Sequence, residues 1–283
     1  MKLAVNYSPQ AESLVSDQAV AIDLFKCPTP MDPVILSTMP DLLVRAAACL
    51  PIYVHFPLSA GDGGIKTTAW DDVDRLCAQT GTPFVNVHLR AQARDFPAMT
   101  ASTKAPSDIE QLTGLFISEV LELTARFGAD RVIVENVSYR GADGKVMYAC
   151  VDPSVIAAVL GETGAGLLLD TAHARLTCDA LGMDVAEYVA ALPLDRLREV
   201  HVTGAQSDGF KLRDSMPMGA EDWKLVEWLM AQIAVGACPA PWAVALEYGG
   251  VGPSFDWRSD AEVIAGNLQR LRELIGGGAS APP

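Results

Sequence analysis

Residues 166–173 read GLLLDTAH, an apolar run that ends in Asp170 and is followed closely by His173. Continuous apolar residues of this length are typical of a parallel strand that is buried on both faces. In α/β folds the carboxyl ends of such strands carry the functional groups. The position of Asp170 and His173 therefore matters as much as the strand itself.

Seven more runs of this kind occur along the chain, separated by segments with helical periodicity. The eight predicted strands cover residues 2–7, 20–26, 52–57, 84–90, 131–137, 166–172, 198–204 and 243–248. The predicted helices cover residues 36–48, 69–80, 108–127, 153–160, 185–192, 221–235 and 259–275, and Ser107 and Glu110 are read as a capping box for the third. The even alternation predicts an α/β fold, a (β/α)₈ TIM barrel. A doubly wound open sheet is the rival architecture.

No linker rich in Pro, Gly or Ser interrupts this pattern, which predicts a single catalytic domain over residues 1–276 and a disordered tail over residues 277–283. The 283 residues are 50% hydrophobic, carry a net charge of −14 and hold six scattered cysteines without a CxxC pair. Binding of nucleic acid is not expected, because phosphate contacts need a basic face. We also expect no membrane span, reduced thiols and a cytoplasmic location, and a homodimer is an open alternative to a monomer.

Ionisable residues gather at the ends of the predicted strands. The four histidines of the chain and three carboxylates lie there, and one more carboxylate follows the seventh strand: His55, His88, His173, His201, Glu135, Asp170, Glu247 and Asp214. Taken singly, a histidine in such a place is more often a hydrogen-bonded core residue than a ligand. The ends of parallel barrel strands converge on one face, however, and several carboxylates buried together need cations. Histidine with Asp or Glu is a ligand set for Zn, Mn, Fe or Co, so we predict a divalent metal site.

The motifs VHFP, VNVHLR, VIVENVSY, LLLDTAH, VHVTG and ALEYGG, in this order, resemble the xylose isomerase-like TIM-barrel superfamily, which includes endonuclease IV and the ketose 3-epimerases. Glu135, Asp170, His201 and Glu247 are similar to the metal quartet of the epimerases, with His173 as a companion histidine. The layout from ENVSY to EDWKLVEWLM also resembles the multinuclear-iron, methanobactin-type enzymes that modify cysteine-bearing peptides.

The resemblance to endonuclease IV implies one metal position with His55, His88 and Glu135. It implies a second position in which Glu135 is a bridge to Asp170, His201 and Glu247. A third position would need His173, Asp214 and a further histidine after the aspartate, but the sequence there reads Asp214-Ser215-Met216-Pro217. The third position is therefore incomplete, and one or two ions are expected.

The favoured function at this point is a sugar or polyol isomerase or epimerase. Glu135 and Glu247 would exchange a proton α to a carbonyl that the metal polarises, and His173 would orient the substrate. The alternative is a di-iron, O₂-dependent enzyme that oxidises a peptide or thiol, which the presence of both His55 and His88 favours. A phosphodiesterase like endonuclease IV and a non-catalytic ligand-binding barrel are less favoured.

Five basic residues are candidate contacts to an anionic substrate, although each is more simply a solvated loop charge. They are Lys26, Arg90, Arg140, Lys211 and Arg213. Arg90 is singled out because it directly follows the strand that carries His88.

Overall fold

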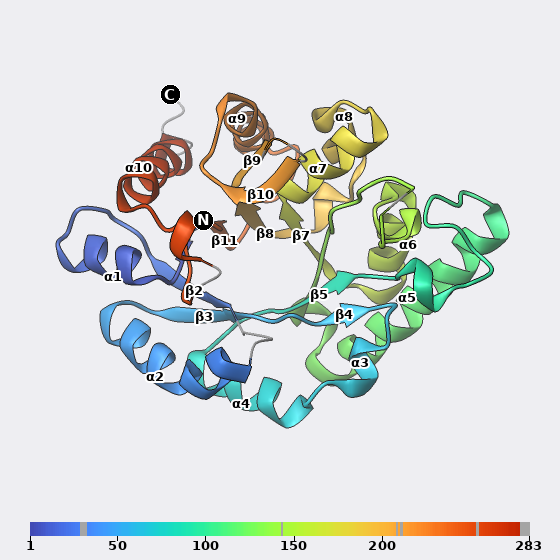
Figure 1. The fold of residues 1–283 in the computed structure, drawn as a ribbon, viewed down its shortest axis with the longest axis horizontal. Helices are drawn as coiled ribbons and strands as arrows, with labels where there is room; N and C mark the ends of the chain where they lie inside the picture. The colour runs from blue at the N-terminus through green and yellow to red at the C-terminus, as the bar shows by residue number, and fades with distance from the viewer. Residues whose placement is uncertain (29–32, 143, 208, 210–211, 253–254, 278–283) are drawn as a thin grey trace.

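The computed structural model describes residues 1–28, 33–142, 144–207, 209, 212–252 and 255–277 (Figure 1). Nine strands form one parallel sheet in the order β3-β2-β1-β11-β8-β7-β6-β5-β4, and β9 and β10 form a separate antiparallel pair. The strands are β1 (Lys2–Asn6), β2 (Leu24–Pro28), β3 (Ile52–His55), β4 (Ser59–Ala60), β5 (Val85–Leu89), β6 (Val132–Glu135), β7 (Gly166–Asp170), β8 (Leu197–Val202), β9 (Gly204–Ser207), β10 (Leu212–Met216) and β11 (Ala243–Leu246).

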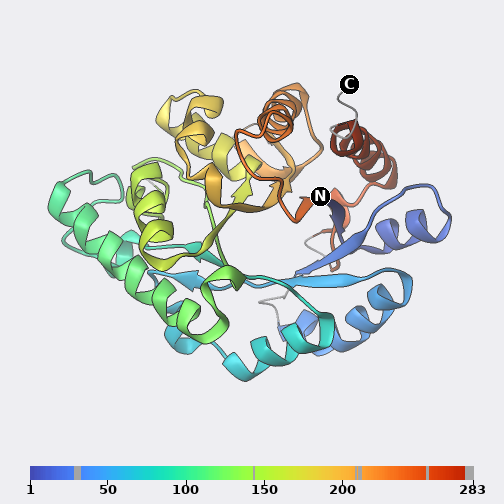
Figure 2. The same cartoon turned by 180° about the vertical axis from the view of Figure 1, so that it is seen from behind.

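Helices surround the sheet, as both views of the ribbon show (Figures 1 and 2). They are α1 (Pro9–Ser16), α2 (Pro33–Cys49), α3 (Gly64–Thr67), α4 (Trp70–Thr80), α5 (Pro106–Phe127), α6 (Pro153–Thr163), α7 (Thr171–Leu181), α8 (Val185–Ala191), α9 (Ala220–Ala234) and α10 (Ala261–Gly277). The predicted TIM barrel is confirmed. The predicted disordered tail is wrong at its first residue, because Gly277 ends α10; residues 278–283 lie outside the described residues.

The sheet closes at a seam between β3 and β5. β4 follows β3 after three residues and pairs with β5, so the first and last strands of the sheet belong to one interrupted segment. Between these two strands the side chain of Asn86 replaces the backbone ladder. Its Oδ1 accepts from Phe56 N at 2.7 Å, and its Nδ2 donates to Phe56 O at 2.8 Å.

Replacing Asn86 with leucine is expected to lower the free energy of unfolding by about 2–4 kcal/mol. The substitution leaves the N–H and C=O of Phe56 buried without a partner, and each such group costs about 1–3 kcal/mol. Urea unfolding of chelator-treated protein, followed by circular dichroism, measures the change. Gln269→Leu on the exposed face of α10 is the control; equal stability of the two variants would contradict this role for Asn86.

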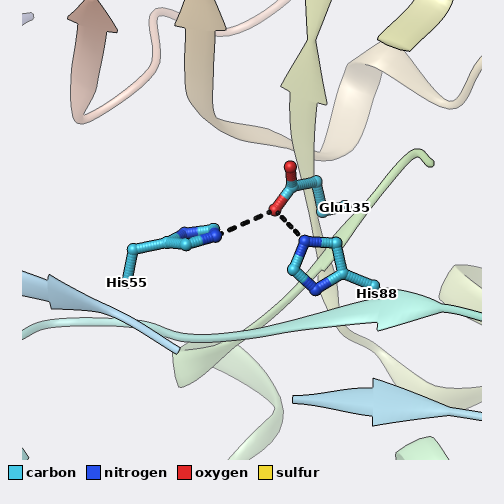
Figure 3. Close-up of side chains that lie close together, drawn as sticks. All are labelled: His55, His88 and Glu135. Carbon is cyan, nitrogen blue, oxygen red and sulfur yellow. Dashed lines mark ion pairs between the residues drawn. The ribbon is translucent and has the colours of Figure 1, made fainter. Parts of the chain in front are cut away.

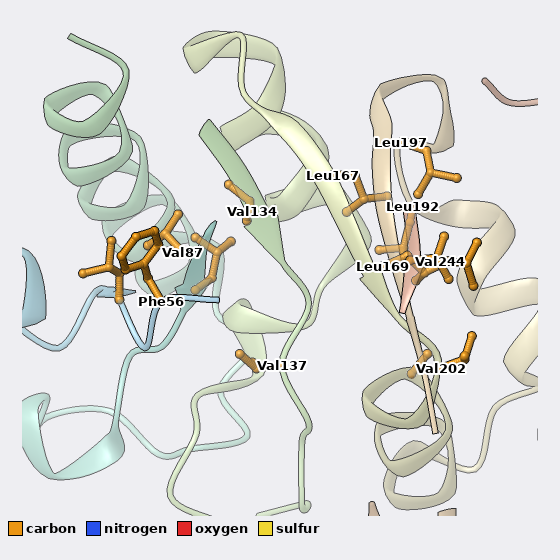
Figure 4. Close-up of a cluster of buried hydrophobic side chains, with 14 of the residues drawn as sticks. Phe56, Val87, Val134, Val137, Leu167, Leu169, Leu192, Leu197, Val202 and Val244 are labelled. Carbon is orange, nitrogen blue, oxygen red and sulfur yellow. The ribbon is translucent and has the colours of Figure 1, made fainter. Parts of the chain in front are cut away.

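Strand residues alternate between two environments. Every second residue, for example Val87, Val134, Leu169 and Val244, faces the helices and belongs to the main core (Figure 4). A second, small buried cluster is formed by Ala4, Leu24, Tyr53, Ala243 and Ala245. The alternation is the period of two that a strand imposes. The side chains that point into the barrel interior therefore recur every two residues, and the last of them on each strand lies at the carboxyl end of the barrel.

The helices depart from prediction in several places: α1 and α3 were not predicted, and α2 and α6 are longer than predicted. α5 begins at Pro106, not after Ser107, and the backbone N–H groups of Asp108 and Ile109 donate to the carbonyl of Ala105. Proline fits the first turn of a helix, which explains the earlier start. The helix α7, which no pattern predicted, begins at Thr171 directly after β7, where the sequence suggested a longer strand.

Candidate metal centre

Six of the predicted site residues lie on or directly after six strands of the sheet. His88 in β5 is in register with Glu135 at the end of β6, and Asp170 at the end of β7 is in register with His201 in β8. His55 ends β3, and Glu247 directly follows β11. The parallel registers bring side chains distant in sequence to one end of the barrel, where their ligand atoms form three groups that could hold a metal ion.

The first group is His55, His88 and Glu135 (Figure 3). The Nε2 atoms of His55 and His88 lie 3.5 and 3.0 Å from Oε2 of Glu135. This carboxylate oxygen is buried and forms no hydrogen bond within the described part of the chain. Three potential ligand atoms thus face one another, and Nε2 of His55 also lies 3.3 Å from Nδ2 of Asn86.

The second group is Glu135, Asp170 and His173. Asp170 is the N-cap of α7, and its Oδ1 accepts from the backbone N–H of His173 at 2.7 Å. The cap fixes His173 in the first turn, where its Nδ1 lies 3.6 Å from Glu135 Oε1 and 3.7 Å from Asp170 Oδ2. Asp214 of β10 approaches the other ring nitrogen of His173, with its Oδ2 3.6 Å from Nε2.

The third group is Asp170, His201 and Glu247. Nδ1 of His201 is buried, forms no hydrogen bond within the described residues and lies 3.1 Å from Oε1 of Glu247. Nε2 on the far side of the ring lies 2.9 Å from Oε1 of Glu199, which also accepts from the hydroxyl of Tyr53 at 2.7 Å. The buried Glu199 therefore orients His201 from behind.

Three of the histidines share one arrangement. His88 Nδ1 lies 3.0 Å from Leu58 O, and His173 Nδ1 lies 2.9 Å from Asn136 O. Since carbonyl and carboxylate oxygens only accept, these nitrogens, like Nε2 of His201, carry the ring hydrogen in the neutral form, and the other nitrogen presents a lone pair. In His88 and His201 that lone pair faces a carboxylate oxygen at about 3 Å, where two acceptors repel unless a cation lies between them. His88 and His201 thus fit a metal centre, whereas the lone pair on Nε2 of His173 faces Oδ2 of Asp214 at 3.6 Å.

The carboxylates attract positive charge into this cluster. Burial lowers the pKa of His173, but Asp170, Asp214 and Glu135 outweigh it and raise the pKa to about 10. Burial likewise lowers the pKa of His88, and Glu135 raises it above its ordinary value. For Glu135 itself, burial raises the pKa, whereas His88 and His55 bring it well below its usual range. The histidines and carboxylates that share protons in the metal-free cluster are the same groups that would bind a divalent ion.

Lys26 was expected as a solvated loop charge, and this expectation is wrong. Its side chain on β2 is 2% exposed and forms an ion pair with Oε1 of Glu247. Burial lowers its pKa to about 8, although Glu135, Glu199 and Asp170 act in the opposite direction. Lys26 and Glu199 are the members of the cluster that the sequence did not identify.

The other predicted residues lie outside the three ligand groups. Arg90 is exposed beyond β5, and Arg140 donates to the carbonyl of Leu212. Asp214 reaches His173, but no second histidine joins it within the described residues, so the incomplete third position of the sequence remains incomplete. Lys211 lies outside the described residues.

Two adjoining cavities open beside the cluster. The first, of about 300 Å³, is lined by Pro57, Ser59, His88, Arg90, Val137, Ser138, Val146 and His173. The second, of about 540 Å³, shares Pro57, Ser59 and Arg90 with it and extends along α3 and α4. Together they form a path from the outer surface to two histidines of the cluster.

The fold and these strand-end groups define a TIM-barrel protein with a candidate metal centre at the carboxyl ends of its strands. The structure resembles D-psicose 3-epimerase from Clostridium cellulolyticum H10, at 14% identity and a TM-score of 0.56, over 99% of this chain and 98% of that one. It also resembles 3-keto-D-glucoside 4-epimerase from E. coli, at 13% identity and a TM-score of 0.57, over 96% of this chain and 99% of that one. At such identities the likeness concerns the fold alone.

Sequence comparison identifies the family. Residues 37–251 match the model of the RiPP precursor modification enzymes MbnB/TglH/ChrH, and the chain belongs to this family. It is 28% identical to a UPF0276 protein of Acaryochloris marina over 146 residues. This match covers 50% of this chain and 47% of that protein. It is 36% identical over 73 residues to a UPF0276 protein of Shewanella amazonensis, over 26% of this chain and 25% of that protein. The matches span less than half of either curated relative.

The remaining expectations concern the thiols and the membrane. All six cysteines are free, as the scattered spacing predicted. Within the described residues, the helices are too short or too polar for one of them to cross a bilayer.

Proposed function

We propose that this protein is a metal-dependent enzyme that oxidises a cysteine-bearing precursor peptide, with iron held by the strand-end groups. The observation that carries the proposal is the group His55, His88 and Glu135, of which His88 lines an open cavity. An epimerase-type quartet needs only the later residues Glu135, Asp170, His201 and Glu247. Two additional histidines around Glu135 add a second ion position, and the family membership supplies the peptide as substrate class.

Iron bound by histidine and carboxylate would supply O₂-dependent oxidation of the substrate. The chain's own residues provide the setting. Glu135 joins the first two groups, since Oε2 faces His55 and His88 and Oε1 faces His173. The adjoining cavities are together large enough for an extended peptide segment next to His88 and His173, and the exposed Arg90 at their junction provides a cationic contact.

The second candidate is a sugar epimerase, which the fold neighbours favour. In that reaction Glu135 and Glu247 exchange the substrate proton between them. Glu135 is only 1% exposed, and its oxygens face histidines rather than the cavity. Glu247 is paired with Lys26. This geometry fits ligand and structural roles better than proton transfer to a substrate, so the peptide reading is preferred.

The test uses full-length protein loaded anaerobically with Fe²⁺, mixed with synthetic peptides that carry a cysteine, and then exposed to O₂. We expect O₂ consumption that depends on the peptide and a change in peptide mass by mass spectrometry. Zn²⁺-loaded protein is the control, because it has the same ionic charge without redox chemistry. Exchange of a ketose C–H with D₂O, without peptide-dependent O₂ consumption, would instead establish the epimerase reading.

A further inference from the structure

Lys26 occupies an unusual place for a lysine. Its ammonium is buried at the carboxyl end of the barrel interior and forms an ion pair with Oε1 of Glu247. This oxygen is the one that lies 3.1 Å from the unpartnered Nδ1 of His201. The positive charge of Lys26 thus lies against the third ligand group, Asp170, His201 and Glu247.

The surroundings of this ammonium are those of a bound cation. Glu135, Glu199 and Asp170 are the carboxylates that act most strongly on its charge, in addition to its direct partner Glu247. An ammonium carries three N–H donors and no acceptor, so it can serve several oxygens and one unprotonated imidazole nitrogen at once. Among the described residues, the ion-pair partners of the carboxylates in the first two ligand groups are histidines, and none is a lysine or arginine.

Charge compensation sets a limit on the number of metal ions. Five carboxylates belong to the cluster: Glu135, Asp170, Glu199 and Glu247, which are buried or nearly so, and Asp214 beside His173. With the ammonium of Lys26 they leave four negative charges if the imidazoles are neutral. Two divalent ions balance this total, whereas three would leave two uncompensated positive charges; without Lys26 a third ion would leave only one. Burial strongly penalises such an excess.

We propose that the ammonium of Lys26 is a built-in cation that takes the place of a metal ion in the group of Asp170, His201 and Glu247. The centre then binds two ions, in the two groups that share Glu135. Glu247 is a partner of Lys26 in this arrangement and not a metal ligand. This inference rests on the proposed metal-dependent function and specifies its stoichiometry.

The test counts bound ions and needs no activity. Full-length protein is stripped with a chelator and dialysed to equilibrium against Mn²⁺, and bound metal per chain is determined by elemental analysis. We expect two ions in the wild-type protein, three in Lys26→Ala and two in Lys224→Ala. Lys224 is an exposed lysine on α9 that forms an ion pair with Glu221 of the same helix and belongs to no ligand group.

A second variant covers the case in which Lys26→Ala does not fold. Glu247→Gln removes the partner of Lys26 and should still bind two Mn²⁺ ions. A loss of one ion would make Glu247 a ligand and overturn the inference. Three ions in the wild-type protein, or two in a folded Lys26→Ala, would also overturn it while leaving the metal-dependent function in place. No bound metal in the wild-type protein would refute the proposed function itself.

Discussion

Glu135→Gln is expected to remove bound metal and to abolish peptide-dependent O₂ consumption. Glu135 is the one carboxylate that belongs to both of the first two ligand groups, and its oxygens face opposite sides. Glutamine has the same shape as glutamate, but its amide group is neutral and binds a metal ion more weakly than a carboxylate does. Loss of residues that only support a ligand typically costs 10–100-fold in metal affinity, so loss of a shared ligand should cost more than about 100-fold. Elemental analysis of bound Mn²⁺ or Fe²⁺ measures this directly.

Glu119→Gln provides a matched control for this prediction. Glu119 on α5 is also a buried glutamate, 3% exposed, but its Oε2 accepts from the backbone N–H of Gly61 at 2.6 Å and takes no part in a ligand group. The control variant should retain its metal and its activity. If Glu135→Gln kept two ions, or if both variants lost metal equally, Glu135 would not be the shared ligand.

The sequence was sufficient to predict the barrel, because the strand candidates are apolar on both faces and alternate regularly with helices. It was less informative about the seam. β4 is only two residues long, and closure depends on the Asn86 side chain, which carries no hydrophobic signal. Similarly, α7 was missed because it begins directly after Asp170 without a loop. The sequence therefore reads as one strand that continues into what is the first turn of the helix.

The sequence predicted the candidate metal ligands, but it did not predict which other charged side chains are buried beside them. His201 was recognised at a strand end, yet Glu199 two residues earlier has the same phase and must point the same way. Lys26 follows Leu24 in the same manner, and Leu24 faces the small interior cluster. Strict application of the two-residue period would have placed both residues inside the barrel. The pairing of Lys26 with Glu247 could not have been predicted, because it depends on the relative positions of β2 and β11, which are both neighbours of β1.

Asp170→Asn is expected to reduce metal binding by more than about 100-fold while leaving the fold intact, for a reason specific to this position. Asp170 has two functions, as a carboxylate in two ligand groups and as the N-cap of α7. Asparagine is as good an N-cap as aspartate, and the amide oxygen can accept from the backbone N–H of His173. The paired hydrogen bonds between the Asn136 side chain and the backbone of residue 170 are also unaffected.

The metal-free variant should therefore be at least as stable as the metal-free wild-type protein. Burial raises the pKa of Asp170, which means that the buried carboxylate charge is held at a cost in the absence of a cation. Asp170→Ala, in contrast, loses both functions and should lower the free energy of unfolding by about 1 kcal/mol through the missing cap. Thermal unfolding with and without Mn²⁺ separates the cases: wild-type protein gains more stability on adding the ion than either variant, because the variants keep only the group of His55, His88 and Glu135 intact. A wild-type-like gain in Asp170→Asn would show that its carboxylate charge is needed for neither ion.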